Sequence, residues 1–168
     1  MAWHFRDEVL PGDPEAVRAL AVATGFFRPD EVAVAVELVE ERLAKGEASG
    51  YFFVFATADD DGGGPGKLAG YACWGPIPCT VSGVDLYWVV VDPARQGGGL
   101  GRALCGRAAA AARARGGTRI YAETSGTAHY APTRAFYLRL GYAEVARLPE
   151  FYAPGDDKIV YGKPLAAD

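Results

Sequence analysis

A glycine-rich turn near the middle of the sequence has the residue types and spacing that bind an anion. The segment DPARQGGGLGRAL, residues 92–104, places Gln96, Gly99 and Gly101 in the pattern Q-x-x-G-x-G, at the start of a predicted helix. Such a turn directs unpaired backbone N–H groups and the positive end of the helix dipole at a ligand in front of the helix. Glycine has no Cβ, so a bulky diphosphate can approach the backbone closely. The turn therefore predicts a phosphate-bearing ligand.

Flanking residues separate this turn from other glycine-rich loops. The glycine run at 62–64 follows three aspartates that would repel phosphate, whereas the run at 97–101 lies between Arg95 and Arg102. A P-loop is excluded because no Lys-Ser or Lys-Thr pair follows the glycines. The dinucleotide fingerprint is disfavoured because Leu104 stands in its third glycine position and because antiparallel strands are predicted before the turn.

Hydrophobic periodicity and turn signals predict the elements that position the turn. The run LYWVVV at 86–91 is apolar without alternation, which predicts a central strand covered on both faces. From 99 to 115 the apolar period changes to 3.6, which predicts a helix, and the next strand at 118–124 then runs parallel to the first. The other expected strands are 3–7, 51–57, 68–74, 143–151 and 158–164, and the other expected helices are 13–24, 29–45 and 132–140.

The predicted order, β-α-α-β-β-β-α-β-α-β-β, describes an α/β fold around one central mixed sheet. A chain of 168 residues has the length of one domain. Ligands of such sheets bind at the carboxyl ends of the strands, and the glycine turn follows directly from the end of the central strand. The predicted fold therefore places the turn at the expected ligand site.

Composition and charge exclude several classes of partner. The net charge of −4 argues against a protein that coats nucleic acid or a membrane surface, although residues 93–122 carry six arginines and no acidic residue. No apolar stretch approaches the roughly 18 residues of a membrane span. Cys73, Cys79 and Cys105 cannot all pair, and the N-terminal residues lack signal-peptide features, so we expect a cytoplasmic protein. No ligand cluster accompanies the cysteines, so we expect no metal.

The sequence resembles the GNAT superfamily of acyl-CoA-dependent N-acyltransferases. The resemblance covers essentially the whole chain and rests on three segments, DLYWVVVDPARQGGGLGRAL, ETSGTAHYAPTRAFYLRLGY and FYAPGDDKIVYGKPL. It implies a GNAT-like mixed, mostly antiparallel sheet of about seven strands flanked by four helices. It also implies a single N-acetyltransferase domain over residues 1–168, which moves an acetyl group from acetyl-CoA to a primary amine by direct transfer in a ternary complex.

The resemblance also implies how this chain would hold acetyl-CoA. Its pyrophosphate would be surrounded by Gln96, Gly97, Gly98, Gly99, Leu100, Gly101 and Arg102. The end of the central strand, Val89, Val90 and Val91, should separate from its neighbour and pair through its backbone with the pantetheine arm. Tyr130 stands where the family often has an asparagine, so its hydroxyl or backbone is the candidate replacement for that cofactor hydrogen bond.

Amide formation needs an acid for the departing thiolate and a base for the amine. Tyr137, in the segment FYLRLGY, is the candidate acid, because tyrosine ionises near about 10 and is protonated at pH 7; the alternative is a core aromatic. Asp85 stands where some family members carry a catalytic glutamate, and it would need a bridging water. An exposed aspartate at a strand end is an equal alternative for it. Glu123 ends the next parallel strand and is the second candidate base, or a residue that holds the loop.

The sequence alone does not determine the identity of the acceptor amine or the oligomeric state. Acidic residues in and beside helix 29–45 could steer a small-molecule or peptide amine, or could simply form a solvated helix face. We interpret His129 as a solvated loop residue rather than part of the acceptor site. Edge strands at 143–151 and 158–164 could pair two copies into a homodimer. The alternative to an enzyme is a non-catalytic acyl-CoA or CoA sensor with the same fold.

Overall fold

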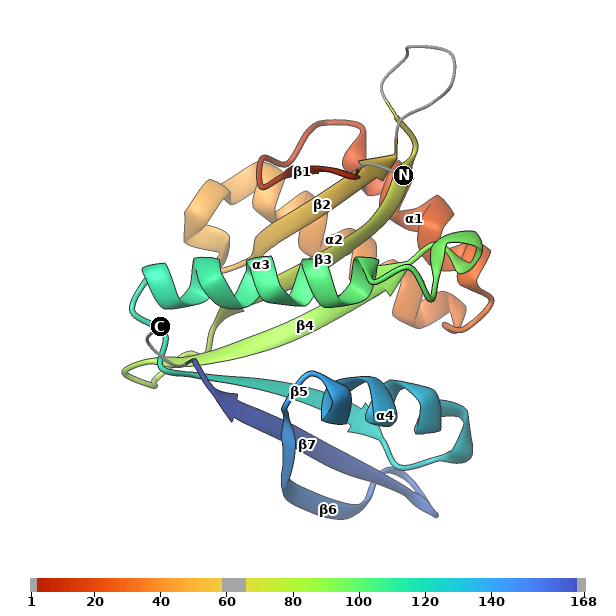
Figure 1. Cartoon of the computed structure of the whole chain (residues 1–168), viewed down its shortest axis with the longest axis vertical. Helices are drawn as coiled ribbons and strands as arrows, with labels where there is room; N and C mark the ends of the chain where they lie inside the picture. Colours follow the sequence, from red (N-terminus) through yellow and green to blue (C-terminus); the bar gives the residue numbers. More distant parts are fainter. Residues whose placement is uncertain (1–2, 59–65, 166–168) are drawn as a thin grey trace.

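A seven-stranded mixed sheet forms the centre of the computed structural model, which describes residues 3–58 and 66–165 (Figure 1). Its strand order is β1-β2-β3-β4-β5-β7-β6. The strands are β1 (Trp3–Arg6), β2 (Phe52–Ala58), β3 (Leu68–Pro76), β4 (Gly83–Val91), β5 (Arg119–Ser125), β6 (Ala143–Ala153) and β7 (Asp156–Pro164). The helices are α1 (Asp13–Thr24), α2 (Pro29–Lys45), α3 (Leu100–Ala114) and α4 (Ala131–Arg139). This arrangement confirms the predicted fold class and element order.

Helices cover both faces of the sheet and divide the core in two. Leu100 and Leu104 of α3 pack in one buried cluster with Tyr137 of α4. Val17 of α1 and Val39 of α2 pack in the other cluster, on the opposite face. Burial of these apolar side chains stabilises each helix against the sheet. Figure 1 shows α3 and α4 in front of the sheet and α1 and α2 behind it.

β4 and β5 run parallel but stay paired over a short stretch. Their ladder holds Gly83 with Arg119, Val84 with Ile120 and Asp85 with Tyr121. Beyond this point, within the described residues, β4 pairs with β3 alone. Figure 1 shows the two strands spreading apart from the paired end. The sheet is therefore open beside the carboxyl half of β4, its central strand.

A β-bulge in β4 changes the face of the sheet to which the side chains after it point. Trp74 of β3 pairs with Leu86 and Cys73 pairs with Trp88, so Tyr87 is an extra residue in the ladder. Leu86 packs in the α3 cluster, whereas Trp88 packs against the α1–α2 cluster. Tyr87 is 36% exposed. Apart from Tyr87, the run 86–91 is covered on both faces as predicted, because Val89 and Val91 pack against the α3 cluster and Val90 lies in the α1–α2 cluster.

Two features of the strands near the site differ from the predictions. β4 begins at Gly83 rather than Leu86, so Asp85 lies inside the strand and does not open it. β7 lies between β5 and β6, so 158–164 is an interior strand and the prediction of a free edge there was wrong. β6 is the edge strand at this end of the sheet, and all of its residues are exposed. The predicted loop at 58–67 falls largely outside the described residues, but the strands it joins do pair antiparallel.

Helices 13–24 and 29–45 have the predicted boundaries. Proline in the first turn of each is compatible with a helix start, because the N–H that proline lacks has no partner inside the helix. Over the described part of the chain, none of the helices combines the length and the apolar character needed to cross a bilayer.

Candidate active site

The glycine turn after β4 is held in shape by its own residues. Asp92 accepts a hydrogen bond from the backbone N–H of Ala94 at 3.0 Å, which caps a short 3₁₀ turn. The side-chain amide of Gln96 donates to the carbonyl of Val91 at 3.3 Å and ties the turn back to the strand end. Gly97 and Gly99 have φ angles of +81° and +85°. These left-handed conformations favour glycine, so the sequence of the turn follows from its backbone.

The start of α3 fits a diphosphate. Gly99 is the N-cap residue, and no side chain among the described residues caps the helix there. Its first-turn N–H groups and the helix dipole therefore favour an anion. Gly101 lets α4 approach, because a Cβ at this position would lie 3.2 Å from the ring of Phe136. Arg102 is exposed beside the turn and adds a positive charge.

Tyr137 of α4 lies in the buried core cluster that α3 and α4 form on one face of the sheet. It is 6% exposed, and its ring contacts those of Tyr142, at 5.3 Å between centroids, and Tyr161, at 6.1 Å. Burial raises the pKa of Tyr137 well above its ordinary value, and nearby Cys105 and Tyr142 raise it further. The phenol therefore stays protonated at neutral pH, as the acid role predicted from sequence requires.

Asp85 and Glu123, the two candidate bases, face the same side of the sheet. Asp85 pairs with Tyr121 in the parallel ladder, and Glu123 lies two residues further along β5. Asp85 is half-buried, and no described side chain donates a hydrogen bond to it. Burial raises the pKa of Asp85, the charge of Glu123 raises it further, and Lys158 lowers it. Glu123 instead forms an ion pair with Lys158 at 2.6 Å.

Tyr130 and His129, which precede α4, both contact the α1–α2 region. The hydroxyl of Tyr130 donates to Glu31 of α2 at 3.4 Å, and burial together with that carboxylate raises the pKa of Tyr130 to about 12. The His129 ring stacks on Phe26 at 4.1 Å and its Nε2 lies 3.0 Å from the Phe26 carbonyl oxygen. His129 is thus exposed but held in place, rather than a freely solvated residue. The predicted cofactor contact of Tyr130 stays a prediction.

Three of the acidic residues in and beside α2 form ion pairs away from the opening between β4 and β5. Glu41 pairs with Lys45 at 2.6 Å, and Glu47 at the end of the helix pairs with Arg115 of α3 at 2.5 Å. Asp30 pairs with Arg28 at 3.1 Å. Glu31 is the member of this acidic run that contacts the segment before α4, through Tyr130. The acidic run is therefore mainly a solvated helix face with local ion pairs.

Sequence reasoning missed two residues of this region, Lys158 and Tyr87. Lys158 lies in a segment that carried the family resemblance. Its pairing with Glu123 can be recognised only once β7 is known to lie beside β5. Tyr87 occupies the bulge of β4 and packs edge to face on Tyr51 at 5.5 Å. Burial, and then the charge of Asp85, raise the pKa of Tyr87 to about 12. No local sequence signal marks a bulge in an uninterrupted apolar run.

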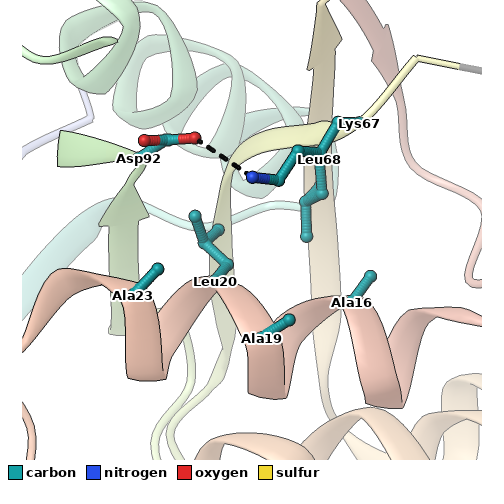
Figure 2. Close-up of a pocket in the computed structure, with 7 residues that line it drawn as sticks. All are labelled: Ala16, Ala19, Leu20, Ala23, Lys67, Leu68 and Asp92. Atoms are coloured by element: carbon teal, nitrogen blue, oxygen red, sulfur yellow. Dashed lines mark ion pairs between the residues drawn. The ribbon is translucent and has the colours of Figure 1, made fainter. Parts of the chain in front are cut away.

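A small cavity of about 110 Å³ lies between α1, the start of β3 and Asp92, which follows β4 (Figure 2). Figure 2 shows the alanines and Leu20 of α1 below an ion pair in which Lys67 and Asp92 are 4.0 Å apart. The rest of its lining is apolar and mostly small, and the two charged side chains pair with each other. The described residues contain no His, Cys, Asp and Glu cluster able to hold a metal ion.

Comparisons with known proteins agree with this geometry. The model of the acetyltransferase (GNAT) family matches residues 17–142. A mycothiol acetyltransferase from Beutenbergia cavernae is 34% identical over 139 residues, 83% of this chain, and the chain spans 43% of that relative's length. A solved structure from Desulfovibrio desulfuricans, described as an acetyltransferase of the GNAT family, is 52% identical with a TM-score of 0.92, covering 98% of this chain and 100% of that one.

A more distant structure shares the fold. An aminoglycoside 6′-N-acetyltransferase complexed with coenzyme A has a TM-score of 0.73 at 21% identity, covering 100% of this chain and 99% of that one. Three findings agree on the family. The family model matches three quarters of the sequence, the Desulfovibrio desulfuricans structure is 52% identical, and the strand order of the sheet is consistent with both. The chain belongs to the GNAT family of acetyltransferases.

Proposed function

We propose that this chain is a single-domain N-acetyltransferase that moves an acetyl group directly from acetyl-CoA to a primary amine in a ternary complex. The observation that supports this most is the separation of β4 from β5 directly before an uncapped, glycine-rich helix start. A diphosphate at that helix start places the rest of an extended cosubstrate along the opening. The aminoglycoside 6′-N-acetyltransferase of the same fold is complexed with coenzyme A, which supports a coenzyme A thioester as the cosubstrate.

The backbone would provide most of the contacts to acetyl-CoA, which supplies the activated acetyl thioester. The turn residues from Gln96 to Arg102 would bind the diphosphate through N–H groups, each charged hydrogen bond contributing roughly 1.5 to 3 kcal/mol. Val89, Val90 and Val91 would bind the pantetheine amides, because no strand of the described residues lies beside this part of β4 on the β5 side. A strand N–H there would also lie near the thioester oxygen and stabilise developing negative charge.

Tyr137 would donate a hydrogen bond to the departing sulfur. Burial raises the pKa of this phenol above its ordinary value of about 10, whereas a free thiol ionises near about 8.5. Full proton transfer from Tyr137 to the thiolate is therefore uphill, and a strengthened hydrogen bond stabilises the leaving group instead. The acceptor amine attacks in its neutral form, and Asp85 or Glu123 takes its proton.

Two further proposals concern the cellular location and the oligomeric state of the enzyme. Cys73 and Cys105 are buried thiols and Cys79 is an exposed one, which supports a cytoplasmic location.

We also propose that two copies pair along β6, because this edge strand is exposed throughout and presents Val145 and Leu148. Sedimentation of the wild type and of Val145→Lys checks this, with a dimer expected for the first and a monomer for the second.

Release of free coenzyme A thiol tests the catalytic proposal. The full chain is mixed with acetyl-CoA and, in turn, spermidine, tyramine and a peptide with a free α-amino group. We expect thiol release that depends on one of these amines, together with a product 42 Da heavier than that amine, the mass change of acetylation. Tight coenzyme A binding without transfer to any primary amine would support a sensor and contradict the proposal.

A further inference from the structure

Lys158 of β7 is held next to Glu123 by contacts on several sides. Its side chain is 16% exposed, and its Nζ lies 2.6 Å from Oε2 of Glu123. The same ammonium lies over the ring of Phe151 at 4.1 Å and near that of Tyr152 at 6.0 Å. In the antiparallel ladder Glu123 is opposite Val160, so Lys158 is its diagonal neighbour on the same face. The ion pair is therefore fixed by strand register and by two aromatic rings.

Asp85 has a different environment from Glu123 although both face one side of the sheet. Asp85 is half-buried, and its carboxylate has no hydrogen bond or ion pair among the described residues. Its last ladder partner is Tyr121, so it lies where β4 and β5 begin to separate. Glu123 is more exposed and has an ammonium as partner. One carboxylate is thus neutralised by a cation and the other is left to accept a proton.

Protonating these two groups has opposite consequences. A proton on Glu123 would break a short, charge-assisted hydrogen bond to Lys158. A proton on Asp85 would remove a half-buried charge that has no partner. Burial and the charge of Glu123 both raise the pKa of Asp85, which brings it closer to the range in which a general base works.

We propose that Lys158 is a positioning residue that holds Glu123 as a fixed anion and thereby leaves Asp85 as the carboxylate that takes the proton of the acceptor amine. This inference rests on the proposed acetyl transfer. As the amine nitrogen forms its bond to the acetyl carbon, the C–S bond breaks with its electron pair going to sulfur. The nitrogen loses one proton, and Asp85 gains it directly or through one water.

Other groups near Asp85 do not change this assignment. From its own strand it faces Tyr87, on which Tyr51 of the β2 side packs. Glu123 from β5 and Lys158 from β7 are the charged groups that act on it. Burial raises the pKa of Tyr87 to about 12, and the charge of Asp85 contributes, so Tyr87 is neutral near pH 7. Besides burial, the pKa of Asp85 therefore depends on one anion and one cation, and each charge can be removed separately.

A titration of the Asp85 side-chain carboxyl by ¹³C NMR in the full chain tests the inference without any substrate. Lys158→Met removes the cation, so the midpoint of Asp85 should rise by about half a pH unit or more. Glu123→Gln removes the anion, so the midpoint should fall by a similar amount. Lys158→Arg keeps the charge and should restore the wild-type midpoint. Lys45→Met breaks another ion pair of 2.6 Å, with Glu41, and should leave Asp85 unchanged.

Turnover measured over pH with the best amine of the panel provides the functional readout. The acidic limb should follow the Asp85 midpoint in each variant, and Asp85→Asn should lose turnover by about 100-fold. The inference is overturned if the two midpoints shift in the same direction or not at all, or if Asp85→Asn retains turnover that Glu123→Gln abolishes. Wild-type chain that binds no coenzyme A by calorimetry would instead overturn the proposed function, which separates the two failures.

Discussion

The rings of Tyr137 and Tyr142 lie edge to face in the core between α3, α4 and the sheet, with centroids 5.3 Å apart. Both side chains are almost fully buried. The hydroxyl of Tyr142 is buried and has no hydrogen-bond partner among the described residues. The pair therefore offers one tyrosine proposed to act on the leaving thiolate and a neighbouring tyrosine whose hydroxyl has no role in the proposed chemistry.

Tyr137→Phe should lower kcat by about 100-fold, because it removes the hydrogen bond proposed to stabilise the departing sulfur. The affinity for coenzyme A should stay within about twofold of the wild type, since the diphosphate is bound elsewhere. Steady-state kinetics and calorimetry measure the two quantities. Equal losses of turnover and affinity would contradict the proposed role and indicate that Tyr137 only supports the core.

Tyr142→Phe is the matched control and also tests the packing. Because it removes a buried hydroxyl without a partner, it should stabilise the protein by about 1 kcal/mol, measured by urea denaturation. Turnover should be unchanged. A loss of stability would show that the Tyr142 hydroxyl has a hydrogen-bond partner in solution.

An ion pair between β1 and α1 should contribute strongly to stability. Asp13 is 4% exposed and accepts hydrogen bonds from Arg6 at 2.8 Å and from the backbone N–H of Leu10 at 2.7 Å. Arg6→Ala leaves this buried carboxylate without its cation and should destabilise the protein by about 3 kcal/mol. Arg28→Ala, which breaks an exposed pair with Asp30, should leave the urea midpoint unchanged. Similar small effects of both variants would contradict this account.

Local sequence signals predicted the parts of the fold that depend on short-range physics. The glycine turn, the amphipathic α3 and the proline-started α1 and α2 each follow from residues within one segment. Hydrophobic periodicity and turn signals also predicted the element order, and the family resemblance added the separation of β4 from β5; the structure has both.

Features that depend on pairing between distant strands could not be predicted. The bulge at Tyr87 exists only relative to the register of β3, and it decides that Leu86 and Trp88 face opposite sides. Likewise, Lys158 contacts Glu123 because β7 inserts between β5 and β6, which no residue of either strand specifies alone. The environment of each candidate base therefore became visible only with the tertiary structure.

The central claim is that backbone amides of the turn after β4 bind the diphosphate of coenzyme A. Gly99 at the start of α3 and Gly116 beyond its end have φ angles of +85° and +90°, and a Cβ added at either residue would meet no described atom within 4 Å. Alanine at either position should therefore cost a similar 1 to 2 kcal/mol of strain, roughly.

Calorimetric titration of coenzyme A into the wild type, Gly99→Ala and Gly116→Ala tests this claim most directly. The account predicts binding by the wild type, an affinity at least about tenfold lower for Gly99→Ala, and an affinity within about twofold of the wild type for Gly116→Ala. Absence of binding by the wild type, or equal losses in both variants, would contradict it.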